Sequence, residues 1–394
     1  MLRTLAPEAG CEASELPLHL GERVGVRGLY KMDRLRALKA IRLEPTDRIP
    51  MWEHYSNPDA EHAITGIDPW EHPKLARERL HELTHMDMGG IPGSDEPIER
   101  LPDQSSFTDS EGRTSVRWGT GRSWHWDWGH RFPSINEVLA YQPLDHLDQR
   151  TADVVASRDY SISVEEMAKQ FQTSIDHARK LAGDRCLVGG GFYNTIFMWP
   201  LLTFGWENFL ELGVAYKDEC KRLLADFSEY SRKVFKAYAL TDVELVTSHD
   251  DICFQAGPVF SPDWLREMIF PYYEEFWGYL NDAGIKVVWI CDGNVNPVAD
   301  DIFACGADGI MSEPYTDWPL IAKKHPNGIF AGDGDNRIIA TNDRDAIFKM
   351  VKDMAAWGKQ YPGYFFCIGN HIPWNLPVDG VKAYFEAAEL YGLR

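Results

Sequence analysis

Three ionisable side chains stand in a row directly after a short apolar run: His249, Asp250 and Asp251. The run at 243–246 is typical of a buried strand in a parallel sheet. A histidine beside a carboxylate can act as a base with an orienting partner, and clustered carboxylates raise one another's pKa, which suits proton transfer near neutral pH. The alternative is that one aspartate braces the loop and the other is solvated.

Polar groups follow most of the other predicted strands in the same way. The predicted strands lie at 49–52, 86–90, 186–191, 243–246, 285–290, 309–311, 328–331 and 364–367, and most are separated by helical periods. About eight strands alternating with helices is the count of an α/β fold of the (β/α)8 TIM-barrel type, in which the carboxyl ends of the strands carry the chemistry. The sequence therefore predicts one barrel domain over residues 29–394.

Two segments fall outside the barrel pattern. Residues 1–28 have no clear period and are predicted to form an N-terminal arm. Residues 94–135 are predicted to be an insertion after the second strand, because a β-hairpin pattern there turns at 110–112 and a Trp/His cluster follows at 124–130. We expect this insertion to form a lid over the mouth that closes on a flat or methylated ligand. A hydrophobic lid without a ligand, or a dimer contact, explains the cluster equally well.

The barrel would gather these polar side chains at its C-terminal face. We expect catalytic roles for His249, Asp250, Asp251, Asp292 and His371. We expect contacts with the substrate from Glu53, His54, Tyr193, Asn294, Glu313, Asp333 and Trp126.

Two cysteines at strand ends suggest a soft-metal site. Cys291 and Cys367 could bind zinc, with His249, His371 or Glu313 completing the coordination, and zinc could then activate a thiol. The alternative is that both are small buried hydrophobic residues, the commonest fate of a free cysteine.

The overall composition narrows the possible partners. A formal net charge of −20 opposes binding to nucleic acid or an anionic membrane surface. Seven scattered cysteines without a CxxC pair indicate reduced thiols and hence a cytoplasmic protein. There is no apolar run of about 18 residues, no signal-peptide pattern and no glycine fingerprint for a nucleotide cofactor. We expect a small-molecule substrate.

The motifs together resemble the uroporphyrinogen decarboxylase superfamily. The resemblance covers residues 31–394 and rests on RLRALKAIRLEPTDRIP, HDDICFQAGPVFSPDWLREMIFPYY, VVWICDGN, IFAGDGDNR and FFCIGNHIPWNLPVDGVKAYFEAA. It implies a (β/α)8 barrel with the active site at the strand carboxyl ends, often as a homodimer.

The resemblance is nearer to one branch of the superfamily. Decarboxylases of the family carry an arginine-rich motif after the first strand that grips propionates, whereas this chain reads MWEHYSNPDAEH there. The corrinoid-dependent methyltransferases carry a zinc-binding HxC on the fifth strand and a further cysteine near the eighth, and Cys291 and Cys367 match those cysteines. The histidine position of the motif is Trp289, so Asp250, Asp292 and His371 could replace the metal as acid–base groups.

The resemblance to that branch implies an enzyme that moves a methyl group from a small O-, N- or S-methylated compound to a corrinoid or a thiol. His249 and Asp250 would handle the proton, and a separate protein would carry the corrinoid. One alternative is a decarboxylase acting on a porphyrinogen or a smaller acid. The other is a non-catalytic barrel that binds a ligand.

Overall fold

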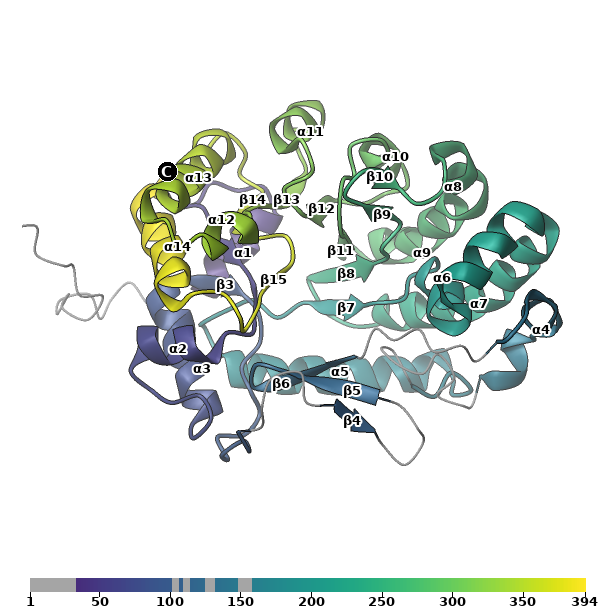
Figure 1. Cartoon of the computed structure of the whole chain (residues 1–394), viewed down its shortest axis with the longest axis horizontal. Helices are drawn as coiled ribbons and strands as arrows, with labels where there is room; N and C mark the ends of the chain where they lie inside the picture. The colour runs from purple at the N-terminus through teal and green to yellow at the C-terminus, as the bar shows by residue number, and fades with distance from the viewer. Residues whose placement is uncertain (1–32, 101–105, 109–113, 125–131, 148–157) are drawn as a thin grey trace, which may run out of the picture.

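A computed structural model describes residues 33–100, 106–108, 114–124, 132–147 and 158–394, which fold as an α/β barrel (Figure 1). Eight parallel strands form one curled sheet in the order β3-β1-β14-β13-β12-β11-β8-β7. A bridge between Met88 and Leu187 joins its two edges. The strands are β1 (Met51–Trp52), β3 (Met86–Met88), β7 (Gly190–Phe192), β8 (Leu245–His249), β11 (Lys286–Cys291), β12 (Gly309–Ser312), β13 (Ile329–Asp333) and β14 (Tyr364–Cys367).

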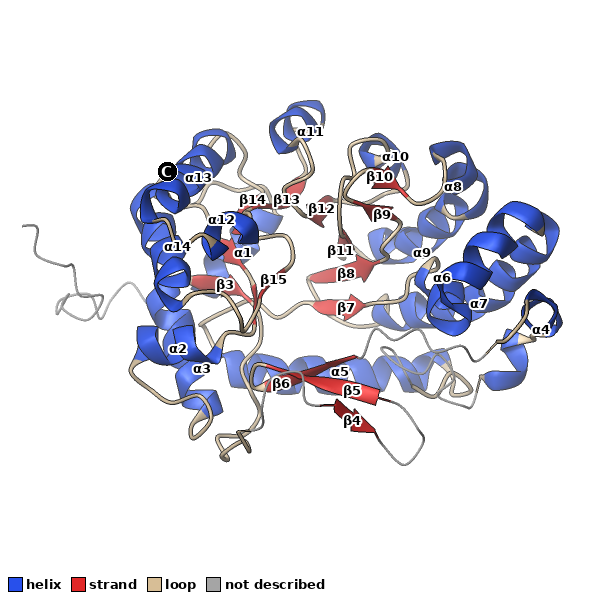
Figure 2. Ribbon diagram, viewed as in Figure 1, coloured by secondary structure: helices blue, strands red, loops and turns tan. Residues whose placement is uncertain are grey.

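Helices surround this sheet, as Figure 2 shows. Local signals set several of their ends: the Ser261 side chain accepts a hydrogen bond from the Trp264 amide, and Pro262 takes the first helical position. None of the helices in the described ranges is long and apolar enough to cross a membrane. The helices are α1 (Asp33–Ile41), α2 (Pro58–Thr65), α3 (Pro73–Thr84), α4 (Ile135–Ala140), α5 (Val164–Ala182), α6 (Met198–Ala215), α7 (Lys217–Tyr238), α8 (Pro262–Met268), α9 (Phe270–Asp282), α10 (Ala299–Ala304), α11 (Trp318–Lys324), α12 (Asn336–Ala340), α13 (Arg344–Gly358), α14 (Val378–Tyr391) and the 3-10 turn η1 (Pro143–His146).

The insertion after β3 contains an antiparallel sheet formed by β4 (Ser106–Thr108), β5 (Thr114–Trp118) and β6 (Gly121–Trp124). Its first two strands are the arms of the predicted hairpin, whose turn at 110–112 lies outside the described residues. The predicted arm at 1–28 and Trp126 also lie outside them. Two short pairs complete the strands: β2 (His54–Tyr55) with β15 (His371–Ile372), and β9 (Cys253–Phe254) with β10 (Gly257–Pro258).

Side chains along each barrel strand alternate between two apolar layers. On β11, Val288 and Ile290 join the cluster inside the barrel, whereas Val287 and Trp289 join the layer between the sheet and the helices. Helix α1 contributes residues such as Ile41 to the inner cluster, so it closes one end of the interior. Polar side chains lie at the opposite end of the barrel, where the carboxyl ends of the strands meet.

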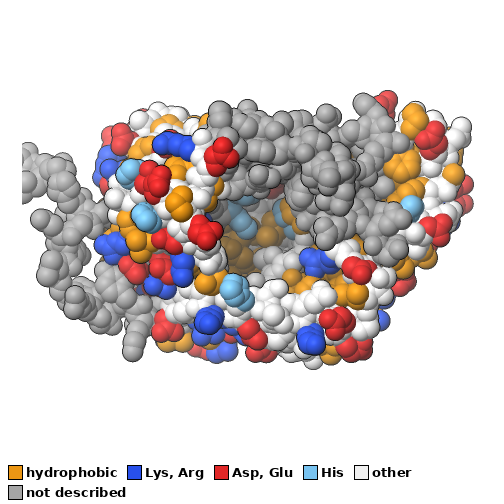
Figure 3. All heavy atoms as spheres, turned by 90° about the horizontal axis from the view of Figure 1, so that it is seen from below, with side chains coloured by type: hydrophobic (Ala, Val, Ile, Leu, Met, Phe, Trp, Pro, Cys, Tyr) orange, Lys and Arg blue, Asp and Glu red, His pale blue; other side chains and the backbone are white. Residues whose placement is uncertain are grey.

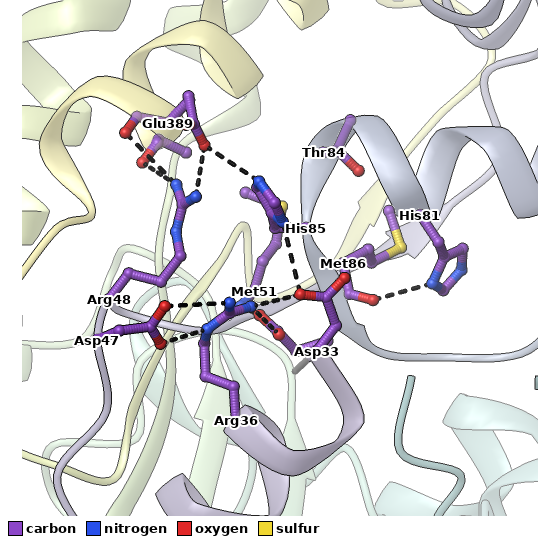
Figure 4. Close-up of polar contacts among 12 residues, drawn as sticks. Asp33, Arg36, Asp47, Arg48, Met51, His81, Thr84, His85, Met86 and Glu389 are labelled. Carbon is purple, nitrogen blue, oxygen red and sulfur yellow. Dashed lines mark hydrogen bonds and ion pairs between the residues drawn. The ribbon is translucent and has the colours of Figure 1, made fainter. Parts of the chain in front are cut away.

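A buried ion network joins α1 to the first two barrel strands (Figure 4). Arg36 is 4% exposed and donates to Asp33 at 2.8 Å and to Asp87 at 2.6 Å. It also donates to Asp47 at 2.8 Å, and the second oxygen of Asp87 accepts the Met51 amide at 2.8 Å. Because each buried charge has a partner of opposite sign, the network holds α1 against β1 and β3.

Arg36→Met should lower the free energy of unfolding by about 3–5 kcal/mol, because the carboxylates of Asp33 and Asp87 then lose their buried partner. The matched control is Arg266→Met, which removes an ion pair to Asp301 from a side chain that is 49% exposed and should cost about 1 kcal/mol or less. Urea denaturation measures both. Equal losses in the two variants would contradict the role given to Arg36.

Candidate active site

The ends of β8 and β11 bring three predicted catalytic residues together. His249 Nε2 lies 2.9 Å from Asp251 Oδ1, which also accepts the backbone amide of Asp292 at 3.1 Å. Tyr193 donates its hydroxyl to Asp251 Oδ2 at 3.4 Å, and its ring centroid lies 4.2 Å from that of His249. The His249 and Asp251 side chains are 19% and 18% exposed. This arrangement fixes the orientation of the imidazole while leaving it accessible.

The carboxyl groups of Asp292 and Glu313 extend the network to β12 and to the loop after β14. Asn370 Nδ2 donates to Asp292 Oδ2 at 3.3 Å and to Glu313 Oε1 at 3.2 Å. Glu313 Oε2 accepts the Gly293 amide at 2.8 Å. Residues from five separate segments therefore share one hydrogen-bonded group, as the barrel prediction requires.

The environment drives the pKa values of this group apart. Burial opposes the charged form of His249, but Asp251 outweighs it by its charge and hydrogen bond, so the pKa of His249 is raised above its ordinary value. Burial likewise opposes the ionised form of Asp251, yet His249 lowers the pKa of that carboxyl. Burial and then the charge of Asp251 raise the pKa of Asp292 to about 7. His249 and Asp292 can thus both hold a proton near neutral pH.

Two other histidines flank this group. His54 and His371 pair across β2 and β15, with ring centroids 5.5 Å apart. Desolvation, followed by the nearby His371 and His249, lowers the pKa of His54 to about 4. Desolvation also lowers the pKa of His371. Both rings are therefore neutral at pH 7, and they suit contact with an uncharged ligand better than proton transfer. Seen from below, the molecule is hollowed near its centre, and hydrophobic and histidine side chains are visible in the hollow (Figure 3).

Asp250 lies on the other face of β8. Its carboxylate accepts the backbone amides of residues 196, 197 and 198, each at 2.8 Å, and the Tyr273 hydroxyl at 2.9 Å. The residue is fully buried, and burial raises its pKa to about 7 against these donors. Because buried protein groups occupy both oxygens, this geometry favours a positioning role for Asp250, at the start of α6, over the predicted catalytic one.

Glu53 and Asp333 are turned toward the outer layer in the same way. Glu53 accepts the Ile368 amide at 3.2 Å and the Tyr384 hydroxyl, and burial raises its pKa to about 8. Asp333 accepts the Trp357 indole at 2.8 Å, and burial raises its pKa to about 6. Both carboxyl groups tie strand ends to helices, so the structure does not bring them to the His249 group.

The family of the chain follows from a comparison with family models. The model described as "Uroporphyrinogen decarboxylase (URO-D)" matches residues 161–391, which is more than half of the chain. The chain belongs to the URO-D family. No curated protein sequence matches the chain.

A comparison with solved structures gives one match that supports the barrel fold. A methyltransferase from Methanosarcina mazei matches with a TM-score of 0.59 at 17% identity, covering 91% of this chain and 98% of the methyltransferase. A sugar phosphate isomerase/epimerase from Parabacteroides distasonis has a TM-score of 0.33 at 13% identity, with coverage of 65% and 91%. A D-psicose 3-epimerase has a TM-score of 0.32 at 12% identity, with coverage of 67% and 93%. Only the first is similar enough to support an argument, and at its identity that argument concerns the fold.

The two cysteines predicted to bind zinc in this URO-D chain face opposite sides of the sheet. Cys291 belongs to the layer between the sheet and the helices, whereas Cys367 belongs to the cluster inside the barrel. Both thiols are fully buried. Within the described ranges no three histidine, cysteine or acidic side chains are grouped to hold a metal ion. These residues do not fit a shared zinc site, because their side chains lie on opposite faces of the sheet and two strands, β12 and β13, lie between β11 and β14.

Sequence reasoning missed Asn370, which bridges two carboxyl groups of this URO-D site. The available signal was its position between Cys367 and His371, directly after a strand. The predicted contact Asn294 lies three residues after the end of β11 and uses its Oδ1 atom to accept the Asn296 amide at 3.1 Å. It therefore shapes the loop instead of joining the Asp292 group.

The variants Asp250→Asn and Asp251→Asn should distinguish a structural role of Asp250 from a catalytic role of Asp251. The first change places an amide among four buried donors, so the free energy of unfolding should fall by about 3 kcal/mol. The second affects a partly exposed side chain and should cost about 1 kcal/mol, while turnover falls by roughly 10²-fold or more because His249 loses its partner. Urea denaturation and initial rates provide the two measurements. A stable Asp250→Asn protein with greatly reduced turnover would restore Asp250 to a catalytic role.

Proposed function

We propose that this URO-D family member is an enzyme that demethylates a small, uncharged methoxylated compound. The observation that carries the proposal is the His249–Asp251 pair next to Asp292, with a raised pKa at both His249 and Asp292. Such a group can deliver a proton to an oxygen atom as its bond to a methyl group breaks.

The negative charge around the site, at the carboxyl ends of the barrel strands, limits the charge that a substrate can carry. Asp251, Asp292 and Glu313 all belong to the hydrogen-bonded group, and the chain carries a net charge of −20. A substrate with several carboxylates, such as a porphyrinogen, would be repelled there. The first barrel strand is followed by Glu53 and His54, where decarboxylases of the superfamily carry arginine. These features favour a neutral substrate over a polyanion.

The nature of the leaving group favours an O-methyl compound. A quaternary amine that loses a methyl group leaves as a neutral amine and needs no proton. An alkoxide or phenoxide is a poor leaving group unless an acid protonates it. In the proposed step the methyl carbon bonds to the nucleophile of an external acceptor as the methyl–oxygen bond breaks. The electron pair of the broken bond stays on oxygen, and the His249 imidazolium supplies the proton. Asp251 holds the imidazole in place and stabilises its charged form.

The methyl acceptor would reach the mouth from outside. We expect a thiol or a corrinoid carried by a separate protein, which when present supplies the nucleophile. An external acceptor needs an open approach, and the side chains of His249 and Asp251 are 19% and 18% exposed at this end of the barrel.

Decarboxylation of a small acid is the second candidate, and the family match supports it. That reaction also ends with a proton delivered to the substrate, which Asp292 could supply because burial raises its pKa to about 7. The two candidates differ in their products, since only decarboxylation releases CO2 without an acceptor.

His249→Asn should reduce demethylation by about 10²- to 10⁴-fold, because the proton donor is lost. The assay follows conversion of 2-methoxyphenol and related methyl ethers to free hydroxyl compounds, with cob(I)alamin or a thiol as acceptor. His325→Asn, a change in a histidine paired with Asp300 on α10, serves as the control and should leave the rate unchanged. Demethylation that survives in His249→Asn, or CO2 release without any acceptor, would contradict the proposal.

The pH dependence of kcat should also identify protonated His249 as the proton donor. The protonated form of His249 is the active one, so kcat should fall as the pH rises through its pKa, which lies above the ordinary value of about 6.5. At pH values well below that pKa, His249 is fully protonated and kcat no longer decreases because of its ionisation. Initial rates at saturating substrate between about pH 6 and 9 measure the profile. A kcat that increases steadily over this range would indicate that His249 acts as a base.

A further inference from the structure

A cavity of about 400 Å³ lies between β7 and α5, apart from the His249 group. Its walls are the glycine run 189–191, one face of α5, Arg158 and Tyr238. Its volume falls within the range of about 300–1,000 Å³ that small-molecule pockets occupy. None of the residues that line it belongs to the hydrogen-bonded group in the mouth.

The glycine run lets the backbone at β7 pack closely against Tyr238, which lines the cavity. Strands and helices usually pack with apolar side chains filling the layer between them, but residues 189–191 contribute none. A Cβ atom added to Gly190 would lie 2.7 Å from the Tyr238 ring, so even an alanine would need this ring to move. The Tyr238 hydroxyl is fixed in turn, because it donates to the Gly191 carbonyl at 2.8 Å.

Arg158 provides a positive charge at one end of the cavity. Its guanidinium carbon lies 5.0 Å from the Phe171 ring centroid and 5.8 Å from the Phe192 ring centroid. It forms no ion pair with a described residue and it interacts with the Tyr160 side chain, but its buried Nε has no hydrogen-bond partner. An unpaired buried donor on a charged group costs free energy that an anionic acceptor would recover. This end of the cavity therefore suits a carboxylate.

The other end of the cavity is apolar. Ile175 and Ala178 of α5 line the cavity together with Val188, and Ala178 packs against the apolar cluster that contains Val188. Seven residues separate Phe171 from Ala178, which corresponds to roughly 10 Å along a helix that rises 1.5 Å per residue. We propose that this cavity binds a monocarboxylate with an apolar body of roughly 10 Å, its carboxylate on Arg158 and its body against Ala178 and Val188. This site is separate from the demethylation site and does not depend on the proposed reaction.

Isothermal titration calorimetry with octanoate and 4-phenylbutyrate tests the proposal on the full chain. At least one of these acids should bind at about one per chain, and octan-1-ol should bind more weakly because it lacks the charge. Arg158→Gln should weaken binding at least about tenfold. Arg266→Gln, which changes an exposed arginine on α8, is the matched control and should bind as the original protein does.

Two more variants keep the test decisive. Ala178→Phe fills the apolar end and should abolish binding even if Arg158→Gln does not fold. His249→Asn should leave binding unchanged, since His249 belongs to the mouth. The proposal is overturned if neither acid binds, if Arg158→Gln binds as well as the original protein does, or if His249→Asn alone removes binding.

Discussion

Successive side chains of a β-strand point to opposite faces of the sheet, and this alternation decides which strand-end groups can meet. His249 and Asp250 are neighbours in sequence, yet one points into the mouth and the other caps α6. The same holds for Glu53, which faces Tyr384 of α14, and for His54, which faces His371. Buried carboxyl groups on the outer face thus anchor the strand ends, and the adjacent residues are held in position for chemistry.

This division also gives the carboxyl groups two different tasks. Asp250 and Glu53 are fully surrounded, so their raised pKa values of about 7 and about 8 accompany a structural function. Asp251 is partly exposed and paired with His249, so its pKa is lowered while that of His249 is raised. A perturbed pKa by itself therefore does not identify a catalytic residue; the side chain must also be able to reach a ligand.

Much of the fold could be predicted from the sequence. Apolar runs, helical periods and caps such as Ser261 located most strands and helices, and their alternation predicted the barrel. The group formed by His249, Asp251 and Asp292 follows from the strand ends. The alternation of side chains along each strand also places Cys291 and Cys367 on opposite faces of the sheet. The role of Asn370 and the cavity beside Arg158 depend on contacts between distant segments, which a single sequence does not contain.

The central claim is that Asp251 makes His249 a proton donor at neutral pH. The most direct test is an NMR titration of the His249 imidazole in the original protein and in Asp251→Asn. We expect a His249 pKa above the ordinary histidine value in the original protein and a clear decrease in the variant, because the partner that stabilises the imidazolium is lost. A His249 pKa at or below the ordinary value, or one that the substitution leaves unchanged, would contradict it.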